Sequence, residues 1–431
     1  MKQLLEMAKK VSDQVEVYST EYTNNEVKFS NAKLHEIESK IQTVVSLRII
    51  KDNSLGVTQT RNLLNREELI QNALDSLKGG VEANYNFPFT NELPHLYTYD
   101  LSADSLSNTQ LVNECSRICE HLQSQTDGEI MAGAAMDIKK IRIINSAGTD
   151  IADQFTTYFS YGGITYPGSA SAVYRIHEKK YFEQMPADMI KELINIYNKS
   201  SKVVEPKGGK MKVLFMPNSL TALIWRILSG TSLVNVYKKM SPIARLTGKK
   251  IFDEKLTIVD NPHDDRFPGA RAFDDEGVAT KPMKIIEKGV LKNFYSDLCY
   301  ASKLNTDSTG NSYEGSPALA HLQIKPGKKS LAQMIKLIDR GIIIEGAMGA
   351  HSGNIPNGDF SVGASPGLYV EKGEIVGRVK DVMIAGNAYK TLKRIVDIGK
   401  TQSLAAVAMW PHCMGKVPPI LCDSVSVTTK N

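Results

Sequence analysis

The chain has 431 residues and a formal net charge of +5 at pH 7, from 52 Lys and Arg against 47 Asp and Glu. This length exceeds one ordinary domain and predicts two or three domains. A hydrophobic share of 42% and a charged share of 23% are typical of soluble globular proteins, and exclude a fibrous or largely disordered chain. The basic residues form only short runs without interleaved aromatic residues, so no nucleic-acid groove is predicted.

Targeting signals are not indicated by the sequence. The first residues, MKQLLEMAKKVSDQ, are amphipathic and lack the apolar stretch and cleavage site of a signal peptide. The longest apolar stretches are too short to cross a bilayer, so no membrane association is expected. Five scattered cysteines, an odd number, predict reduced thiols. We therefore expect a cytoplasmic protein.

The first half of the chain combines strand-like and helix-like segments. Alternating β-branched residues indicate the strands, and apolar residues spaced three and four apart indicate the helices. In chain order the predicted elements are a helix at the N-terminus, strands over 15–23, 27–37 and 42–60 (the last with a turn at Asp52 and Asn53), helices over 66–77 and 107–122, strands over 141–182, and a helix over 187–198.

A polar segment at 205–209 contains a proline, a lysine and two glycines, and predicts a domain boundary. It separates an N-terminal α+β domain, 1–205, from a C-terminal α+β domain, 206–431. The predicted elements of the second domain are a buried strand over 211–216, a helix over 219–228 with Asn218 as its N-cap, hairpins turning at 287–289 and 371–373, and helices over 330–339 and 388–398. The predicted strands follow one another in antiparallel runs rather than alternating with helices. The predicted fold class is therefore α+β, with antiparallel sheets flanked by helices.

Three consecutive carboxylates, Asp274, Asp275 and Glu276, are followed by Gly277. One interpretation is a solvent-exposed turn, because short acidic side chains bond their own backbone and glycine accepts a positive φ. The other is a functional loop, because two further unusual loops follow it. The first is the STGN loop, which consists of Ser308, Thr309, Gly310 and Asn311.

The second unusual loop lies in the glycine-rich stretch 346–387. It contains His351, Ser352, Asn354 and Asp359 in loop-like sequence. Loops with many glycines usually bring backbone close to another group, since glycine has no side chain to prevent it. These residues are therefore candidates for binding.

These motifs resemble the TldD/PmbA family, and within it the PmbA-like (TldE-like) branch. The resemblance rests on FDDEG, STGN, the GDFSVGA run and the hairpin followed by IAGN. It covers 211–427 well and the first 200 residues in outline. It implies a TldD/PmbA-like α+β fold and a metallopeptidase-related protein, in a family that carries the historical label of modulator of DNA gyrase.

Catalytic, TldD-like members of that family carry a His-Glu pair and a second His on the helix after the first strand of the C-terminal half. There the imidazoles bind zinc and the glutamate activates water. Setting that motif on SLTALIWRILSG places Trp225 at the first His, Arg226 at the Glu and Gly230 at the second His. No His, Asp or Glu occurs anywhere in 206–252. We therefore expect no metal or other cofactor in this chain, and zinc in a TldD-like partner.

Arg226 has two interpretations. It is either an exposed helix arginine or a side chain that holds a carboxylate or a carbonyl near the vacant metal position.

Other candidate sites carry less specific signals. Cys115 and Cys119 are four apart on a predicted helix, and packed thiols are favoured over a metal clip. His351 could approach Asp359 across a short loop. TldD-like enzymes take a late cysteine as a zinc ligand, and Cys413, next to His412, lies in that region; the spacing differs, so an ordinary packed thiol is favoured. The sequence contains no GxSxG elbow and no phosphate-binding glycine motif.

The resemblance implies a heterodimer with a TldD-like chain that cuts extended or unfolded peptides inside a closed cavity. The residues 274–277, 308–311 and 351–359 would line that cavity or the subunit seam. A homodimer is the alternative assembly. Two other functions stay open: a self-sufficient peptidase with a non-standard site at His351 or at His412 and Cys413, and a non-enzymatic modulator of a gyrase-linked toxin system. The sequence assigns no catalytic residue.

Overall fold

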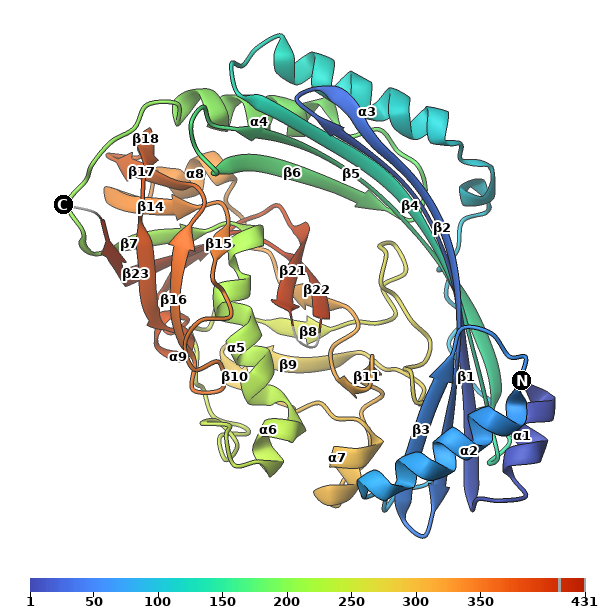
Figure 1. The fold of residues 1–431 in the computed structure, drawn as a ribbon. Helices are drawn as coiled ribbons and strands as arrows, with labels where there is room; N and C mark the ends of the chain where they lie inside the picture. The colour runs from blue at the N-terminus through green and yellow to red at the C-terminus, as the bar shows by residue number, and fades with distance from the viewer. Residues whose placement is uncertain (410–411, 430–431) are drawn as a thin grey trace.

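A strongly curved antiparallel sheet forms one side of the protein, and the C-terminal half of the chain lies inside its curve (Figure 1). The structure is a computed structural model that describes residues 1–409 and 412–429. Strands and helices are mixed, and most strand pairs are antiparallel, which confirms the predicted α+β class. In the described residues no helix combines the length and the apolar character needed to cross a membrane.

The curved sheet has the strand order β3-β2-β1-β4-β5-β6, and every neighbouring pair is antiparallel. Its strands are β1 (Gln14–Ser30), β2 (Lys33–Lys51), β3 (Ser54–Thr60), β4 (Glu129–Asn145), β5 (Asp150–Thr165) and β6 (Ala172–Lys179). The β2–β3 turn passes through Asp52 and Asn53 with φ of 51° and 55°, as a tight hairpin requires. The predicted turn is confirmed.

Helices cover the outer face of the curved sheet. They are α1 (Lys2–Ala8), α2 (Arg66–Ser76), α3 (Asn108–Gln123) and α4 (Ala187–Lys199), with the short 3-10 helices η1 (Leu77–Gly79) and η2 (Leu101–Ser105). In Figure 1, α3 and α4 lie on the convex side. Ser107 begins α3 with a capping box, in which Gln110 completes the exchange of hydrogen bonds. The inner face of the sheet is left to contact the C-terminal half.

The C-terminal half contains two larger sheets. One has the order β15-β16-β19-β23-β7-β14-β17-β18, with β20 paired to β23, and the other has the order β10-β9-β8-β13-β22-β21. The strands are β7 (Gly209–Phe215), β8 (Ile258–Asp260), β9 (Met283–Glu287), β10 (Val290–Leu291), β11 (Ser312–Tyr313), β12 (Ser316–Pro317), β13 (Leu322–Ile324), β14 (Arg340–Ile344), β15 (Ala347–Met348), β16 (Asp359–Ala364), β17 (Gly367–Glu371), β18 (Glu374–Val379), β19 (Met383–Asn387), β20 (Ile395–Ile398), β21 (Ser403–Met409), β22 (His412–Val417) and β23 (Ile420–Thr428). The helices are η3 (Pro217–Ser219), α5 (Thr221–Thr231), α6 (Leu233–Tyr237), α7 (Leu298–Lys303), α8 (Leu331–Ile335) and α9 (Ala388–Thr391).

Helix α5 lies at the centre of this half. Every residue of α5 except Ser229 is buried, so the helix packs on all sides rather than on one apolar face. Its start differs from the prediction: a 3-10 turn over Pro217–Ser219 comes first, and the N-cap is Leu220 without a side-chain bond. The predicted cap at Asn218 is wrong because this turn already orders the backbone there.

The segment 388–398 also differs from the prediction of one helix. α9 ends at Thr391, and Ile395–Ile398 form β20, which pairs with β23. Branched side chains such as Ile395 and Val396 suit a strand, and β23 offers a partner that the helical periodicity could not reveal. The two Glu-Lys-Gly hairpins are confirmed as β9–β10 and β17–β18, and they belong to different sheets.

An apolar cluster crosses the segment 205–209. It joins Leu193 and Ile196 of α4 to Leu214 of β7 and Ile343 of β14. The two halves therefore share buried surface, while the division at 205 stays a prediction.

Cysteine reactivity tests this packing. Cys115, Cys119, Cys413 and Cys422 are buried and Cys299 is partly exposed. Burial raises the pKa of Cys115 to about 12 and that of Cys119 to about 11, which disfavours their reactive thiolates. With Ellman's reagent we expect Cys299 alone to react quickly in the native protein, and all five thiols to react in guanidinium. Rapid native reaction of Cys115 or Cys119 would contradict the packing.

Candidate functional site

The three-carboxylate turn is buried rather than exposed. Asp274 is fully buried, and its Oδ1 accepts hydrogen bonds from the N–H groups of Glu276 (3.0 Å) and Val278 (2.9 Å). Its Oδ2 accepts from the N–H of Ser312 in β11 at 2.9 Å. Gly277 closes the turn with φ of 75°. The turn is present as predicted, but its interpretation as solvent-exposed is wrong, because distant segments cover it.

Asp275 connects the turn to the curved sheet. Its Oδ1 accepts from Arg271 Nη2 at 2.7 Å and from the hydroxyl of Tyr18 in β1 at 3.2 Å. Its Oδ2 accepts from the N–H of Glu314 at 2.9 Å. Thr90 adds a bond from its hydroxyl to the carbonyl of Gly277 at 2.6 Å. The two halves of the chain are thus joined by polar contacts on both sides of the turn.

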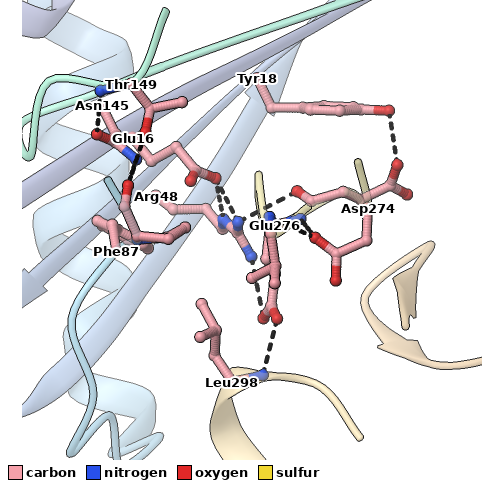
Figure 2. A network of polar contacts seen from close by, with 12 residues as sticks. Glu16, Tyr18, Arg48, Phe87, Asn145, Thr149, Asp274, Glu276 and Leu298 are labelled. Atoms are coloured by element: carbon pink, nitrogen blue, oxygen red, sulfur yellow. Dashed lines mark hydrogen bonds and ion pairs between the residues drawn. The ribbon is translucent and has the colours of Figure 1, made fainter. Parts of the chain in front are cut away.

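Glu276 makes the third connection. Its Oε2 accepts from the N–H of Leu298, the first residue of α7, at 2.8 Å, and its Oε1 lies 3.6 Å from Arg48 Nη1. Arg48, in β2, also pairs with Glu16 of β1 and donates to the carbonyl of Asp275 at 3.2 Å. Figure 2 shows Arg48 between Glu16 and Glu276. One guanidinium therefore holds the turn against the curved sheet.

This junction contains more negative than positive groups. Its carboxylates are Glu16, Asp274, Asp275, Glu276 and Asp297, and the cations that face them are Arg48, Arg271 and Lys139. Burial raises the pKa of both Asp274 and Glu276, and the charge of Asp274 raises that of Glu276 further. Because three cations cannot neutralise five carboxylates, we infer that the junction retains protons near neutral pH.

The STGN loop lies beside the turn and is tied to β8. Thr309 donates to Asn311 Oδ1 at 2.7 Å, and Asn311 Nδ2 donates to Asp260 Oδ2 at 2.8 Å. Asp260 is fully buried, and burial raises its pKa to about 6. Gly310 has φ of 72°, and a Cβ there would lie 2.8 Å from the carbonyl oxygen of Ala279. Ser308 Oγ accepts from the N–H of Gly310 at 3.3 Å. These residues fix the loop within the chain.

Arg226, which the motif alignment sets at the Glu, clamps the glycine-rich loop. Its Nε donates to the carbonyl of Asp359 at 2.7 Å, Nη1 to that of Ala350 at 3.0 Å and Nη2 to that of Ser352 at 2.7 Å. The side chain is fully buried, and burial lowers its pKa to about 10, so it stays charged at neutral pH. The interpretation as an exposed arginine is wrong, because the side chain is buried and donates to three backbone carbonyls.

Tyr389, at the start of α9, fills the space beside Gly230. Its hydroxyl donates to the carbonyls of Arg226 at 3.1 Å and Pro356 at 3.3 Å. A Cβ at Gly230 would collide with this hydroxyl, and a Cβ at Gly358 would collide with the ring. Glycine at 230 is therefore explained by the packing of Tyr389.

The residues at the expected metal position do not fit a zinc ion. Arg226 supplies a permanent positive charge, and Gly230 supplies no side chain. Trp225 lines a cavity of ≈ 210 Å³ together with Cys413 and Tyr295. Within 1–409 and 412–429, no three His, Cys, Asp or Glu side chains are grouped so that they could hold a metal ion.

The remaining candidate residues are dispersed. Cys413 is buried, as favoured from the sequence, and its thiol donates to the carbonyl of Leu319 at 3.4 Å; burial raises its pKa. His351 is exposed, and no hydrogen bond or ion pair joins it to Asp359 among the described residues. The exposed Asp359 instead accepts from Asn387 Nδ2 at 2.9 Å.

Asn354 is also exposed, and its Oδ1 accepts from the N–H of Asn357 at 3.1 Å. The 351–359 segment thus presents polar side chains to solvent while Arg226 holds its backbone.

Replacing Arg226 tests the clamp. Arg226→Met removes the donor from one buried and two partly buried carbonyls, so we expect the free energy of unfolding to fall by about 3 kcal/mol and amide exchange in 350–359 to accelerate. The exposed Arg245→Met is the matched control, with an expected change below about 0.5 kcal/mol. Unchanged exchange in the Arg226 variant would show that the loop does not depend on the clamp.

The pH dependence of stability tests the junction. Burial raises the folded pKa of Glu276 well above its unfolded pKa of ~4.3, so its proton stabilises the folded state fully below the unfolded pKa and progressively less as pH rises through the folded pKa. Urea unfolding should show that wild-type stability, relative to Glu276→Gln, falls from pH 6 to pH 9. The exposed Glu371→Gln serves as control and should run parallel to wild type. A relative stability that rises with pH would contradict the assignment.

Known proteins share this architecture. Family models described as "PmbA/TldA metallopeptidase C-terminal domain" and "PmbA/TldA metallopeptidase domain 1" match residues 208–429 and 15–77. The metalloprotease PmbA homolog of Haemophilus influenzae is 23% identical over 419 residues, which cover 91% of each chain.

Two solved structures show the same fold. TldE from Thermococcus kodakarensis has a TM-score of 0.90 at 22% identity, and covers 99% of both chains. A Thermotoga maritima protein, whose description proposes a modulator of a DNA gyrase, has a TM-score of 0.87 at 25% identity and the same coverage of 99%. The C-terminal family match alone spans more than half of the 431 residues, and the motif-based resemblance is confirmed: the chain belongs to the PmbA/TldD metallopeptidase family.

Proposed function

We propose that this chain is a PmbA/TldE-like subunit that lacks its own zinc site and acts with a TldD-like, zinc-carrying partner on extended or unfolded peptides in the cytoplasm. The observation that carries the proposal is the contact of buried Arg226 with three backbone carbonyls. A guanidinium in that place repels a metal cation and offers no lone pair to it.

The neighbouring residues support the same conclusion. Tyr389 occupies the space beside Gly230, so a histidine there would displace it. Cys413, the late cysteine of the chain, is buried and bonds a backbone carbonyl. A self-sufficient zinc peptidase would need these groups to rearrange together.

The candidate loops divide into two kinds in this proposal. The residues 274–277 and 308–311 hold the chain together, because their polar groups bond within it. The exposed side chains of His351, Asn354 and Asp359 are available to a partner or a peptide. We place the subunit seam at this exposed segment, in a heterodimer with the TldD-like chain; a homodimer is the alternative.

Reconstitution tests the proposal. Purified alone, the chain should bind no zinc and cleave no unfolded casein. Mixed with a TldD-like chain that has an intact His-Glu motif, it should form a stable complex that cleaves casein and contains zinc bound by the partner. The exposed Asn354→Trp should weaken the complex, whereas the buried Cys413→Ala should leave casein cleavage within about twofold. A zinc-dependent peptidase activity of the isolated chain would overturn the proposal.

Modulation of DNA gyrase is the alternative suggested by the description of the Thermotoga maritima relative. The small net charge of +5 on 431 residues favours no nucleic-acid surface, and no site residue described above supports this function.

A further inference from the structure

A cavity of ≈ 820 Å³ lies between strand β6 and helix α4 on one side and the C-terminal half on the other. Its size is within the range of ligand pockets. Helix α8, the β17–β18 turn and strand β21 form its other walls. This cavity is separate from the Arg226 position and from the carboxylate turn.

Strand β6 meets the cavity with its edge. Five consecutive residues of the strand, 174–178, line the cavity. Side chains alternate between the two faces of a strand, so a cavity on one face would contact only every second residue. β6 is also the last strand of its sheet and pairs only with β5. An unpaired strand edge therefore faces the cavity.

The β5–β6 register shows which backbone groups of β6 point into the cavity. The N–H of Tyr166 donates to the carbonyl of Ser171 at 3.1 Å, and these residues continue by one pair the β5–β6 register, which ends with Thr165 opposite Ala172. In an antiparallel pair, opposite residues alternate between bonded and non-bonded pairs. It follows that the backbone groups of Val173, Arg175 and His177 bond β5. The N–H and C=O groups of Tyr174, Ile176 and Glu178 point outward, away from β5.

The outward groups of β6 differ in whether the described residues offer them a partner. Arg175 Nη1 donates to the carbonyl of Tyr174 at 2.9 Å, as expected for an outward carbonyl. Among residues 1–409 and 412–429, no partner is found for the outward N–H and C=O groups of Ile176 and Glu178. Such groups form a template for another strand.

The side chain of Glu178 adds a charge to this edge. It lines the cavity, and no ion pair or hydrogen bond engages its carboxylate among the described residues. The neighbouring Arg175, unlike Glu178, already has charged partners: its guanidinium lies 3.0 Å from Glu345 and 2.8 Å from Glu192. Burial raises the pKa of Glu178 to about 7, and a basic group beside it would favour its charged form. Glu178 is thus suited to bind a cation.

We propose that an extended peptide binds in this cavity as an additional strand on β6, with a basic side chain against Glu178. Main-chain bonds to Ile176 and Glu178 would accept most sequences, and the carboxylate would select a basic residue at one position. This site rests on the proposed function, since it would hold a segment of the peptide that the partner cleaves.

N-methylated peptides test strand addition directly. The probe is a fluorescein-labelled peptide, acetyl-Thr-Val-Lys-Val-Thr-amide, titrated with the isolated chain by fluorescence anisotropy. Two further versions of this peptide carry N-methyl groups on every second backbone amide. The amides that are methylated in one version are unmethylated in the other. Only one edge of the bound peptide faces β6. The version methylated on that edge should bind at least about tenfold more weakly than the parent peptide, and the other version within about twofold of it. Equal binding by both versions, or no binding by the parent peptide, overturns the proposal.

Variants of the chain locate the site. Ile176→Pro removes an outward N–H without removing a bond to β5, and should weaken binding at least about fivefold. Gln59→Pro makes the same change at an exposed position of β3, the opposite edge of the sheet, and should leave binding unchanged. Glu178→Gln should weaken the lysine peptide about tenfold and leave its norleucine analogue unchanged. Equal effects of Glu178→Gln on both peptides would contradict the role of the carboxylate.

These measurements use the chain without a partner. If the isolated chain does not bind the peptide, but its complex with the TldD-like chain still assembles and cleaves casein, only the site on β6 is rejected. Failure of assembly, with normal peptide binding, would reject the proposed function and leave a peptide-binding protein.

Discussion

A buried guanidinium is the constraint on which the C-terminal half of this protein depends. Arg226 retains its charge at neutral pH, and the surrounding residues of α5 are almost all buried. A charge in such a place is tolerated only when its donors are satisfied, and three loop carbonyls provide the acceptors. In our proposal the same contacts order the loop over 350–359, and Arg226 stands where a catalytic member of the family would carry the glutamate that activates water.

The carboxylate turn imposes a second constraint, on the relation between the two halves. Arg48 in the curved sheet contacts Glu16 and Glu276 together, and Tyr18 contacts Asp275. These bonds hold the concave face of the sheet toward the C-terminal half, as Figure 1 shows. Because the sheet is curved, it meets that half closely at the turn and leaves a cavity beside β6. The peptide site that we propose lies in this cavity.

Local patterns predicted the elements well where short-range chemistry determines them. The Asp52–Asn53 turn, the two Glu-Lys-Gly hairpins and the capped helix α3 follow from backbone preferences of a few neighbouring residues. Burial of the acidic turn could not be predicted, because its partners Tyr18 and Arg48 lie more than 200 residues away in the chain. The role of Tyr389 beside Gly230 was missed for the same reason. The segment 395–398 became a strand because β23 was available to pair with it.

The central claim concerns the position occupied by Arg226, and anomalous diffraction measured above and below the zinc absorption edge tests it most directly. Crystals of the complete chain, soaked in zinc at neutral pH, should show no anomalous peak beside α5 and clear density for a guanidinium in contact with the carbonyls of Ala350, Ser352 and Asp359. A strong zinc peak beside α5, bound by side chains of this chain and with Arg226 displaced, would contradict the account.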